Sequence, residues 1–307
     1  MFEELPPNNP ASIAIQTILF NTPLDRLERT LEAFDNTARL GTRDLMNSGL
    51  TILIGDASPQ RTVYEAQLDE WKARFTHLAD IRYTFFNRNV GTSRGHNRLA
   101  ASFTDSEYIV TSNPDIIVEP RALWRMLTVF NDQQVGMVEA KQLPIEHPKD
   151  YDPGTGQTSW ATTAFAMTPR SLFDELGGFD QKTFFMYCDD VDYSWRVREA
   201  GRSVIFQPAS VVFHDKHLNT EGAWMPTGAE VKHSASAALL LAHKWSRPDL
   251  VKSILASFKA SKKTAQKEAA AEFEKAFKAG RLVEPRDPQH KIATFVGSHY
   301  AQHRFSL

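Results

Sequence analysis

The chain has 307 residues, of which 42% are hydrophobic and 23% are charged, and its formal net charge at pH 7 is −2. This length and apolar content are enough for a sizeable hydrophobic core, which argues against an intrinsically disordered chain. The near balance of acidic and basic residues argues against a dedicated nucleic-acid binder, because such proteins carry a strong basic excess. Cys188 is the only cysteine, so the sequence offers neither an internal disulfide nor a thiolate-rich zinc site.

The hydropathy pattern of the sequence indicates neither export nor membrane insertion. The first residues, MFEELPPNNP, are acidic and rich in proline, whereas a secretory signal begins with basic residues followed by an apolar stretch. The longest apolar run, 235–242, is much shorter than the roughly 20 residues of a membrane-spanning helix. We therefore expect a cytoplasmic protein, with a position at the inner face of a membrane as the alternative.

The first half of the chain alternates apolar runs typical of strands with segments of helical periodicity. Strands are expected at 12–20, 50–54, 81–86, 108–111 and 135–140. Helices are expected from about residue 22, at 63–78, from about 93 to 103 and at 121–131. This alternation predicts an α/β fold with a mostly parallel, Rossmann-like sheet that has helices on both faces.

Ligands of such sheets bind beyond the carboxyl ends of the strands, so the segments that follow the strands are the candidates for chemistry. These segments are 21–23, 55–58, 87–97 and 112–115. A polar, proline-bearing stretch at 144–160 is interpreted as a surface loop that could close over the site.

In the segment 112–115, Asn113 and Asp115 flank Pro114, which restricts the turn. Two oxygen ligands so placed can meet one hard cation, and Mg²⁺ or Mn²⁺ needs only one or two carboxylates when a diphosphate supplies further oxygens. An ordinary surface turn is the alternative interpretation.

Three acids, Asp189, Asp190 and Asp192, crowd the expected start of another helix. The helix dipole accounts for one or two acids at that position but not for all three. Because clustered carboxylates repel, at least one is expected to have a raised pKa, which suits a general base. Asp192 is the expected ion-pair partner of Arg196, four residues later.

Two further segments carry polar groups with weaker signals. In the segment 87–97, Gly91 and Gly95 allow close backbone approach, and Asn89, Arg94 and Asn97 supply donors, although neither phosphate-binding glycine motif is present. In the segment 206–217, a short strand at 210–213 delivers His214, followed by Asp215 and His217. A lone histidine is more often structural than a ligand.

Taken together, the motifs resemble, in order, those of the inverting family 2 glycosyltransferases of the GT-A fold. The resemblance covers residues 12 to 217, and the segment 184–201 is most similar to bacterial rhamnosyltransferase-like enzymes that build surface polysaccharides. The matching motifs are residues 20–23, Asp56-Ala57-Ser58, Asn89-Val90-Gly91 with Asn97, Asn113-Pro114-Asp115, Gly177-Gly178-Phe179-Asp180, Asp189-Asp190-Val191-Asp192 with Trp195-Arg196, and His214.

This resemblance implies roles for individual residues. Asp190 would be the catalytic base with Asp189 beside it, Asp115 and His214 would hold a divalent metal (Mg²⁺ or Mn²⁺), and Asp56 would read the nucleobase. The implied nucleotide-sugar site comprises Asn21, Asp56, Ser58, Asn89, Gly91, Arg94, Asn97, Asn113 and Trp160. Two departures matter: Gly55 stands where the family often has Asp, and Asn113 stands at the first acidic position of the metal motif.

The expected function is the transfer of a hexosyl or deoxyhexosyl group from a UDP-, dTDP- or GDP-sugar to a saccharide or lipid-linked saccharide acceptor, with inversion and without a nucleic-acid partner. A sugar nucleotidyltransferase is the alternative enzyme, although segment 20–27 lacks the glycine-rich, basic loop that such enzymes carry after the first strand. A non-catalytic carbohydrate-binding or assembly subunit of the same fold is the third hypothesis, and Asn113 favours it mildly.

The C-terminal part has a different composition. We expect a glycosyltransferase domain at 1–222 and a helical extension at 223–307. Within the extension, residues 244–281 contain ten Lys and Arg against four Asp and Glu, and apolar residues repeat at four-residue spacing. A solvated helical appendage is the simpler interpretation, and a peripheral membrane contact through 244–281 is the alternative.

Overall fold

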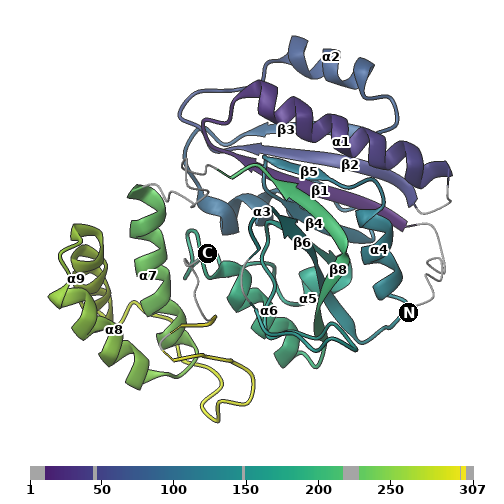
Figure 1. Ribbon diagram of the computed structural model, residues 1–307. Coiled ribbons are helices and arrows are strands. Elements are labelled where there is room, and N and C mark those ends of the chain that lie inside the picture. Colours follow the sequence, from purple (N-terminus) through teal and green to yellow (C-terminus); the bar gives the residue numbers. More distant parts are fainter. Residues whose placement is uncertain (1–10, 44–46, 147–148, 217–227, 298, 302–307) are drawn as a thin grey trace.

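A computed structural model describes residues 11–43, 47–146, 149–216, 228–297 and 299–301. His217, singled out in the sequence, lies outside the described residues. Within the described part, the chain forms an eight-stranded sheet in the order β3-β2-β1-β4-β7-β6-β8-β5, with a group of three helices beside it (Figure 1). The strands are β1 (Ala11–Leu19), β2 (Asn47–Asp56), β3 (Asp80–Phe85), β4 (Tyr108–Ser112), β5 (Ile116–Val118), β6 (Val135–Leu143), β7 (Phe165–Pro169) and β8 (Ser203–His214).

The helices alternate with the strands in the first part of the chain and follow one another in the last part. They are α1 (Leu24–Arg43), α2 (Glu65–Arg74), α3 (Gly91–Ser102), α4 (Ala122–Val129), α5 (Arg170–Glu175), α6 (Asp189–Glu199), α7 (Gly228–Lys244), α8 (Pro248–Ala260) and α9 (Thr264–Lys278). The predicted α/β class and helical C-terminal extension are confirmed.

The sheet is mixed, with a parallel half that carries most of the predicted strands. Strands β3, β2, β1 and β4 run parallel, so their carboxyl ends lie at one edge. β7 is antiparallel to both of its neighbours, β6 and β8 are parallel, and β5 closes the far edge antiparallel to β8. The pairs Leu19↔Asp56 and Thr17↔Ser112 place the segments after β2 and β4 on either side of the end of β1.

Helices cover both faces of the sheet, as predicted. Leu27, Leu31 and Phe34 of α1 are fully buried and pack in one core with α2 and α4. Helices α3, α5 and α6 pack on the opposite face in separate apolar clusters. Each such buried side chain contributes roughly 1.5–3 kcal/mol of transfer free energy, so the helical repeat in the sequence translates directly into the layered core.

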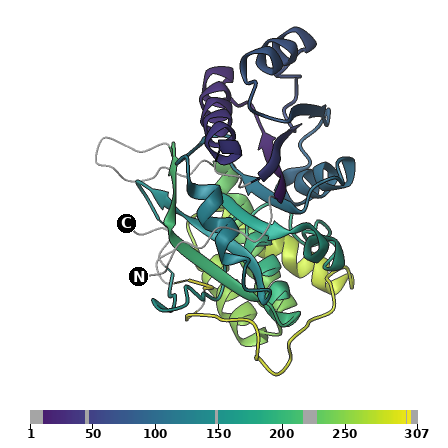
Figure 2. The ribbon, with the colours of Figure 1, turned by 90° about the vertical axis from the view of Figure 1, so that its right-hand side faces the viewer.

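The C-terminal helices pack on the outer side of α6 rather than on the sheet. Ala237, Leu241 and Trp245 form one cluster with Trp195 of α6, and Tyr300 joins it. Helices α8 and α9 pack in turn on α7 through a second cluster. Figure 2 shows this helical group on the α6 side of the sheet. None of the helices in the described ranges has the length and hydropathy needed to cross a membrane.

Candidate active site

The predicted metal residues come together where β4 ends. His214, the last residue of β8, pairs with Ile116 of β5 across an antiparallel ladder, which brings its ring over the Asn113–Asp115 turn. Nε2 of His214 lies 3.3 Å from Oδ1 of Asp115 and 3.2 Å from Nδ2 of Asn113. Asn113 and Asp115, which their spacing in the sequence links, and His214, which only the family resemblance links to them, therefore form one contact group.

Gln142 of β6 determines which ring nitrogen of His214 faces this group. Nδ1 of His214 lies 2.8 Å from the amide oxygen of Gln142, which is an acceptor, so Nδ1 carries a proton and donates it. In the neutral imidazole, Nε2 then presents its lone pair toward Asp115. The amide nitrogen of Gln142 donates to Thr162 at 2.9 Å and so holds this orientation. Gln142 could not be predicted from the sequence because no motif contains it.

These residues fit a divalent cation that is completed by substrate oxygens. Two acceptor atoms 3.3 Å apart, Oδ1 of Asp115 and Nε2 of His214, have the separation expected for two ligands that share one ion at about 2.1 Å each. Within the described ranges, no group of three or more His, Cys, Asp or Glu residues could hold a metal by itself. Such a site therefore depends on a diphosphate or water for its remaining ligands.

Basic side chains surround the same turn. Arg26 of α1 lies 4.0 Å from Asp115 and 3.5 Å from Asp215, and Arg29 lies 3.5 Å from Asp215. Burial lowers the pKa of Lys216, despite the opposing attraction of Glu146 and Asp115. These three cations could not be predicted from the sequence, since a helix face and a residue after a strand carry no motif. Their positive charge suits a site for an anionic diphosphate.

The acid pair, Asp189 and Asp190, forms the first two residues of α6 and follows a strained turn. Tyr187 and Cys188 both have left-handed backbones, with φ of 67° and 56°, a conformation that costs non-glycine residues free energy and clusters at functional sites. Asp189 is 4% exposed, and its Oδ2 accepts hydrogen bonds from Thr92 Oγ1 at 2.7 Å and Ser93 Oγ at 2.9 Å. Burial raises the pKa of Asp189, although both hydroxyl groups oppose the rise. At least one raised pKa was expected in the acid cluster from repulsion between carboxylates; at Asp189 the cause of the raised pKa is burial instead.

Asp190 and Asp192 differ in their surroundings. Asp190 is half-buried, and its Oδ1 accepts a hydrogen bond from the N–H of Val191 at 2.9 Å. Asp192 is fully buried and its Oδ2 accepts from Nε of Arg196 at 2.9 Å, so the predicted ion pair is confirmed. The three acids thus comprise two structural carboxylates and a more accessible one.

Gly91 allows α3 to approach the segment before the acid pair. Its φ is 74°, and a Cβ there would lie 2.1 Å from the carbonyl oxygen of Phe185. That carbonyl accepts a hydrogen bond from the N–H of Thr92 at 3.0 Å. A substitution at Gly91 would therefore displace Thr92, which holds Asp189. Gly91 therefore has a structural role in addition to the nucleotide contact predicted for it.

The predicted nucleobase residues form a tightly bonded turn after β2. Asp56 is fully buried and accepts hydrogen bonds from the N–H groups of Ser58 and Thr62 and, at 2.5 Å, from the hydroxyl of Tyr83. Burial alone would raise the pKa of Asp56, but these hydrogen bonds outweigh it and lower the pKa. Asn21, with φ of 52°, donates its N–H to Oγ of Ser58 at 2.8 Å. The side chain of Ser58 also hydrogen-bonds to Asp56, so about four donors already occupy its acceptor positions, and contact of Asp56 with a nucleobase stays a prediction.

The other predicted contacts with the nucleotide sugar are distributed around these groups. Asn89 accepts a hydrogen bond from the N–H of Gly91 at 3.1 Å, and Arg94 is exposed on α3. Both polar atoms of Asn97 bind the backbone of Phe179, at 2.8 Å each. Asn97 therefore links α3 to the Gly177-Gly178-Phe179-Asp180 segment. Direct contact of these three residues with a nucleotide sugar stays a prediction.

The predicted lid is attached to the sheet at several points. Lys149 forms a buried ion pair with Glu139 of β6, and its Nζ lies 4.4 Å from the ring centroid of Trp160. Trp160 is 3% exposed and also packs edge-on against Tyr300, with ring centroids 5.0 Å apart. Closure of this loop over substrates stays a prediction, and such a motion would have to leave these contacts intact or break a buried ion pair.

Comparisons with known proteins agree with the resemblance in the sequence. No protein-family model matches the chain. It is 28% identical over 148 residues to the O-antigen chain rhamnosyltransferase WbaN of Salmonella anatum, which covers 41% of this chain and 46% of that protein. It is 30% identical over 95 residues to the N-acetylglucosaminyl-diphospho-decaprenol L-rhamnosyltransferase of Mycobacterium tuberculosis, covering 31% of this chain and 30% of that protein.

A third relative, the rhamnosyltransferase WbbL of Escherichia coli, is 25% identical over 143 residues, covering 37% of this chain and 54% of that protein. The chain thus matches between 30% and 54% of the length of these relatives.

Two solved structures have the same fold. The structure of GalNAc-T7 with UDP, GalNAc and Mn²⁺ has a TM-score of 0.63 at 13% identity and covers 92% of this chain and 57% of that one. The mannosyltransferase PcManGT from Pyrobaculum calidifontis, in complex with GDP-Man and Mn²⁺, has a TM-score of 0.55 at 15% identity, covering 89% and 83%. The predicted GT-A fold and the resemblance to rhamnosyltransferase-like proteins are confirmed.

Proposed function

For a chain of the GT-A fold that is similar to rhamnosyltransferases, we propose an inverting glycosyltransferase that moves a hexosyl or deoxyhexosyl group from a nucleotide diphosphate to an acceptor hydroxyl. The acceptor is a saccharide or lipid-linked saccharide used in the synthesis of a surface polysaccharide. The observation that carries the proposal is the acid pair at the start of α6, in which Asp189 is fixed by two hydroxyl groups and Asp190 is more accessible.

The turn at the end of β4 supports departure of the nucleotide. Asp115 and His214, with Asn113 beside them, would hold Mg²⁺ or Mn²⁺, and a bound cation stabilises negative charge on a departing phosphate. Arg26 adds positive charge beside the same turn, and Lys216, whose pKa is lowered by burial, lies near the same acids. Of the two solved structures with the same fold, one contains UDP, GalNAc and Mn²⁺ and the other GDP-Man and Mn²⁺, which supports a nucleotide-sugar donor.

The acid pair supports attack by the acceptor. Asp190 takes the proton of the acceptor hydroxyl as its oxygen attacks the anomeric carbon from the face opposite the phosphate, so a single displacement inverts that centre. General-base assistance of this type contributes about 10²–10⁴ in rate. Asp189, whose hydrogen bonds come from α3, keeps the first turn of α6 in place beside the donor-binding segments.

The decisive test of the function is the Asp190→Asn variant. We expect transfer from a panel of UDP-, dTDP- and GDP-sugars to fall by about 10²-fold or more, because the amide cannot accept the proton. Nucleotide binding, measured by calorimetry, should change little because Asp190 lies outside the turn at β4. Asp69→Asn, an exposed acid on α2, is the matched control. Wild-type turnover in the Asp190→Asn variant would disprove the base assignment.

A second variant, Asp115→Ala, tests the metal residues. We expect calorimetry to show that Mn²⁺ no longer strengthens nucleotide diphosphate binding, whereas the weak metal-free binding by Arg26 and Lys216 persists. The control is the same titration of the wild-type protein with a nucleoside, which lacks the phosphates. If Mn²⁺ strengthened binding equally in wild type and variant, Asp115 would not be a ligand.

A further inference from the structure

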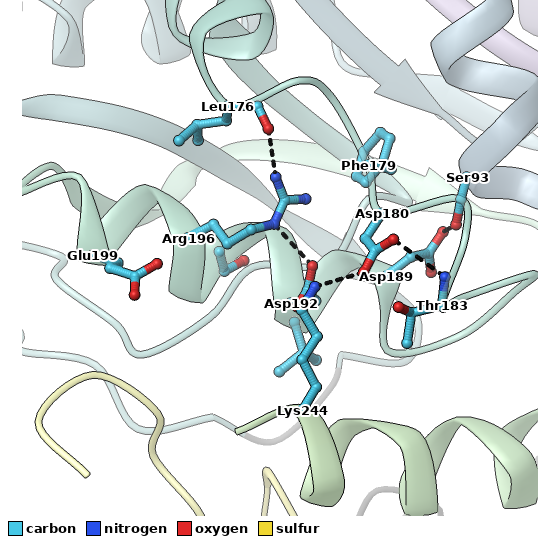
Figure 3. Close-up of polar contacts among 12 residues, drawn as sticks. Ser93, Leu176, Phe179, Asp180, Thr183, Asp189, Asp192, Arg196, Glu199 and Lys244 are labelled. Atoms are coloured by element: carbon cyan, nitrogen blue, oxygen red, sulfur yellow. Dashed lines mark hydrogen bonds and ion pairs between the residues drawn. The ribbon is translucent and has the colours of Figure 1, made fainter. Parts of the chain in front are cut away.

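Lys244 at the end of α7 is buried against the main domain, although it opens the basic segment 244–281. Its side chain is 6% exposed, and its Nζ lies 2.7 Å from Oδ2 of Asp180 and 2.6 Å from Oδ1 of Asp192. A buried ammonium persists only where opposite charges replace its lost hydration. Two carboxylates from separate segments do so here, as Figure 3 shows.

Asp192 joins this lysine to the catalytic helix. It belongs to the first turn of α6, two residues after Asp190. Besides Lys244 and Arg196, it accepts a hydrogen bond from Nε1 of Trp245 at 3.1 Å. The indole of Trp245 also packs edge-on against Trp195 of α6, with ring centroids 5.2 Å apart. The end of α7 therefore binds the first turn of α6 through both charge and packing.

Asp180 connects Lys244 to the segment between α5 and α6. Its Oδ1 accepts hydrogen bonds from the N–H groups of Lys182 and Thr183, at 3.2 and 3.1 Å. The preceding residue, Phe179, is the one whose backbone is bound by Asn97 of α3. Lys244 thus connects α7 to both segments that position the acid pair, the turn held by α3 and the helix that begins with Asp189.

We propose that Lys244 is a positioning residue of the transfer reaction, which through Asp180 and Asp192 fixes the first turn of α6 and the orientation of Asp190. The inference rests on the proposed function, since positioning has a kinetic consequence only if Asp190 acts on an acceptor. The C-terminal segment accordingly belongs to the catalytic unit and is more than a solvated appendage. Transfer requires close alignment, and a displacement of about 1 Å can cost on the order of 10²-fold in rate.

The test compares Lys244→Met and Lys244→Arg with wild type. Methionine preserves the volume of the side chain but removes its charge. We expect kcat to fall by about 10- to 100-fold, donor KM to stay within about threefold, and the amides of the first turn of α6 to exchange hydrogen faster. Arginine keeps the charge and should restore part of kcat. Lys72→Met, which removes a surface ion pair with Asp80 on α2 and β3, is the matched control and should behave as wild type.

Asp180→Asn is the milder variant if Lys244→Met does not fold, because it removes one of two partners of Lys244 and leaves Asp192 in place. We expect a smaller fall in kcat at unchanged donor KM. The proposal would be overturned if the folded Lys244→Met variant had wild-type kcat and wild-type hydrogen exchange in α6. If that variant does not fold, the same result for Asp180→Asn would overturn it. If wild-type protein transferred no sugar, the proposed function would fail, and hydrogen exchange alone would still show whether Lys244 orders α6.

Discussion

The burial of the Asp189 carboxylate lowers the stability of the folded protein. Burial raises its pKa, so folding penalises the charged form of Asp189 relative to the unfolded chain. Thr92 and Ser93 both donate to the same atom, Oδ2, and the carbonyl oxygen of an asparagine can accept both hydrogen bonds in its place. Asp189→Asn is therefore informative, because it keeps the hydrogen-bonding geometry of the side chain and removes its charge.

We expect Asp189→Asn to melt at the same temperature as wild type or a few degrees higher at pH 8, while its transfer rate falls. The sign follows from linkage: an acid with a raised folded-state pKa contributes stability below its unfolded pKa, near 3.9, and loses it as the pH rises through the folded-state value. The advantage of the neutral amide should therefore shrink toward pH 4. Melting curves from pH 4 to 8 measure it, and a variant that melts lower at pH 8 would contradict the expectation.

Residues at strand ends could be predicted because their positions depend on local order in the sequence. Asp56, Asn113 and Asp115 follow buried apolar runs, and the Asp192–Arg196 pair follows from helical spacing alone. The partners that give these residues their properties could not. Gln142 orients His214 across 72 residues, and Thr92 binds Asp189 across 97. Such contacts depend on how distant elements pack, which no local pattern encodes.

The direction in which a side chain points could not be predicted from the sequence either. Asn97 was assigned to the nucleotide-sugar site, a contact that stays a prediction, but its two hydrogen bonds to the backbone of Phe179 were not foreseen. Lys244 was counted with the solvated charges of the C-terminal segment and is instead buried. In both cases the residue type and the helix were foreseeable, but the face of the helix that meets another element was determined by tertiary packing.

At the level of elements, β8 shows why one predicted strand was too short. The sequence predicts 210–213, because Pro208 interrupts the apolar pattern, whereas the strand runs from Ser203 to His214. The register along β6 shifts between Ala140↔Gln207 and Lys141↔Val211, so the interruption is accommodated as a bulge. Proline is tolerated at such bulges because it has no N–H to contribute to the ladder. The bulge sets the register that brings His214 opposite Ile116.

Two strands and a helix escaped prediction for a related reason. β5 has only three residues, which is too few to show a period, and it follows the Asn113–Asp115 turn directly. β7 and α5 are contiguous, with Pro169 and Arg170 at their junction, so the change of period falls inside a short segment. Because β7 is antiparallel to β4 and β6, the sheet is more mixed than the alternation of the larger elements predicts.

At the scale of the whole molecule, charge is divided between two parts. Residues 1–243 contain 22 Lys and Arg and 31 Asp and Glu, whereas 244–281 contain 10 and 4, so their net charges are −9 and +6. The structure refines this division, because Lys244 neutralises buried acids and is not part of the surface field. The remaining basic residues lie mainly on α8 and α9, at one side of the molecule in Figure 1.

The outer face of α9 combines positive charge with an exposed aromatic ring. Phe277 is 61% exposed, and Lys275 and Lys278 in the last turn of the same helix are exposed as well. Exposed aromatic and basic side chains together favour the surface of an anionic bilayer, where each basic residue contributes about 1 kcal/mol. A lipid-linked acceptor would give such a contact a purpose, because it would hold the acid pair near the membrane.

We therefore predict that the protein sediments with vesicles containing anionic lipid but not with neutral vesicles, and that salt weakens the association. Deletion from Lys244 onward cannot test this, since it also removes the partner of Asp180 and Asp192. The variant Lys275→Glu with Lys278→Glu changes exposed charges on α9 and leaves that contact intact. We expect it to lose vesicle binding while retaining transfer to a soluble acceptor. Unchanged sedimentation of the double variant would contradict the assignment of the membrane contact to α9.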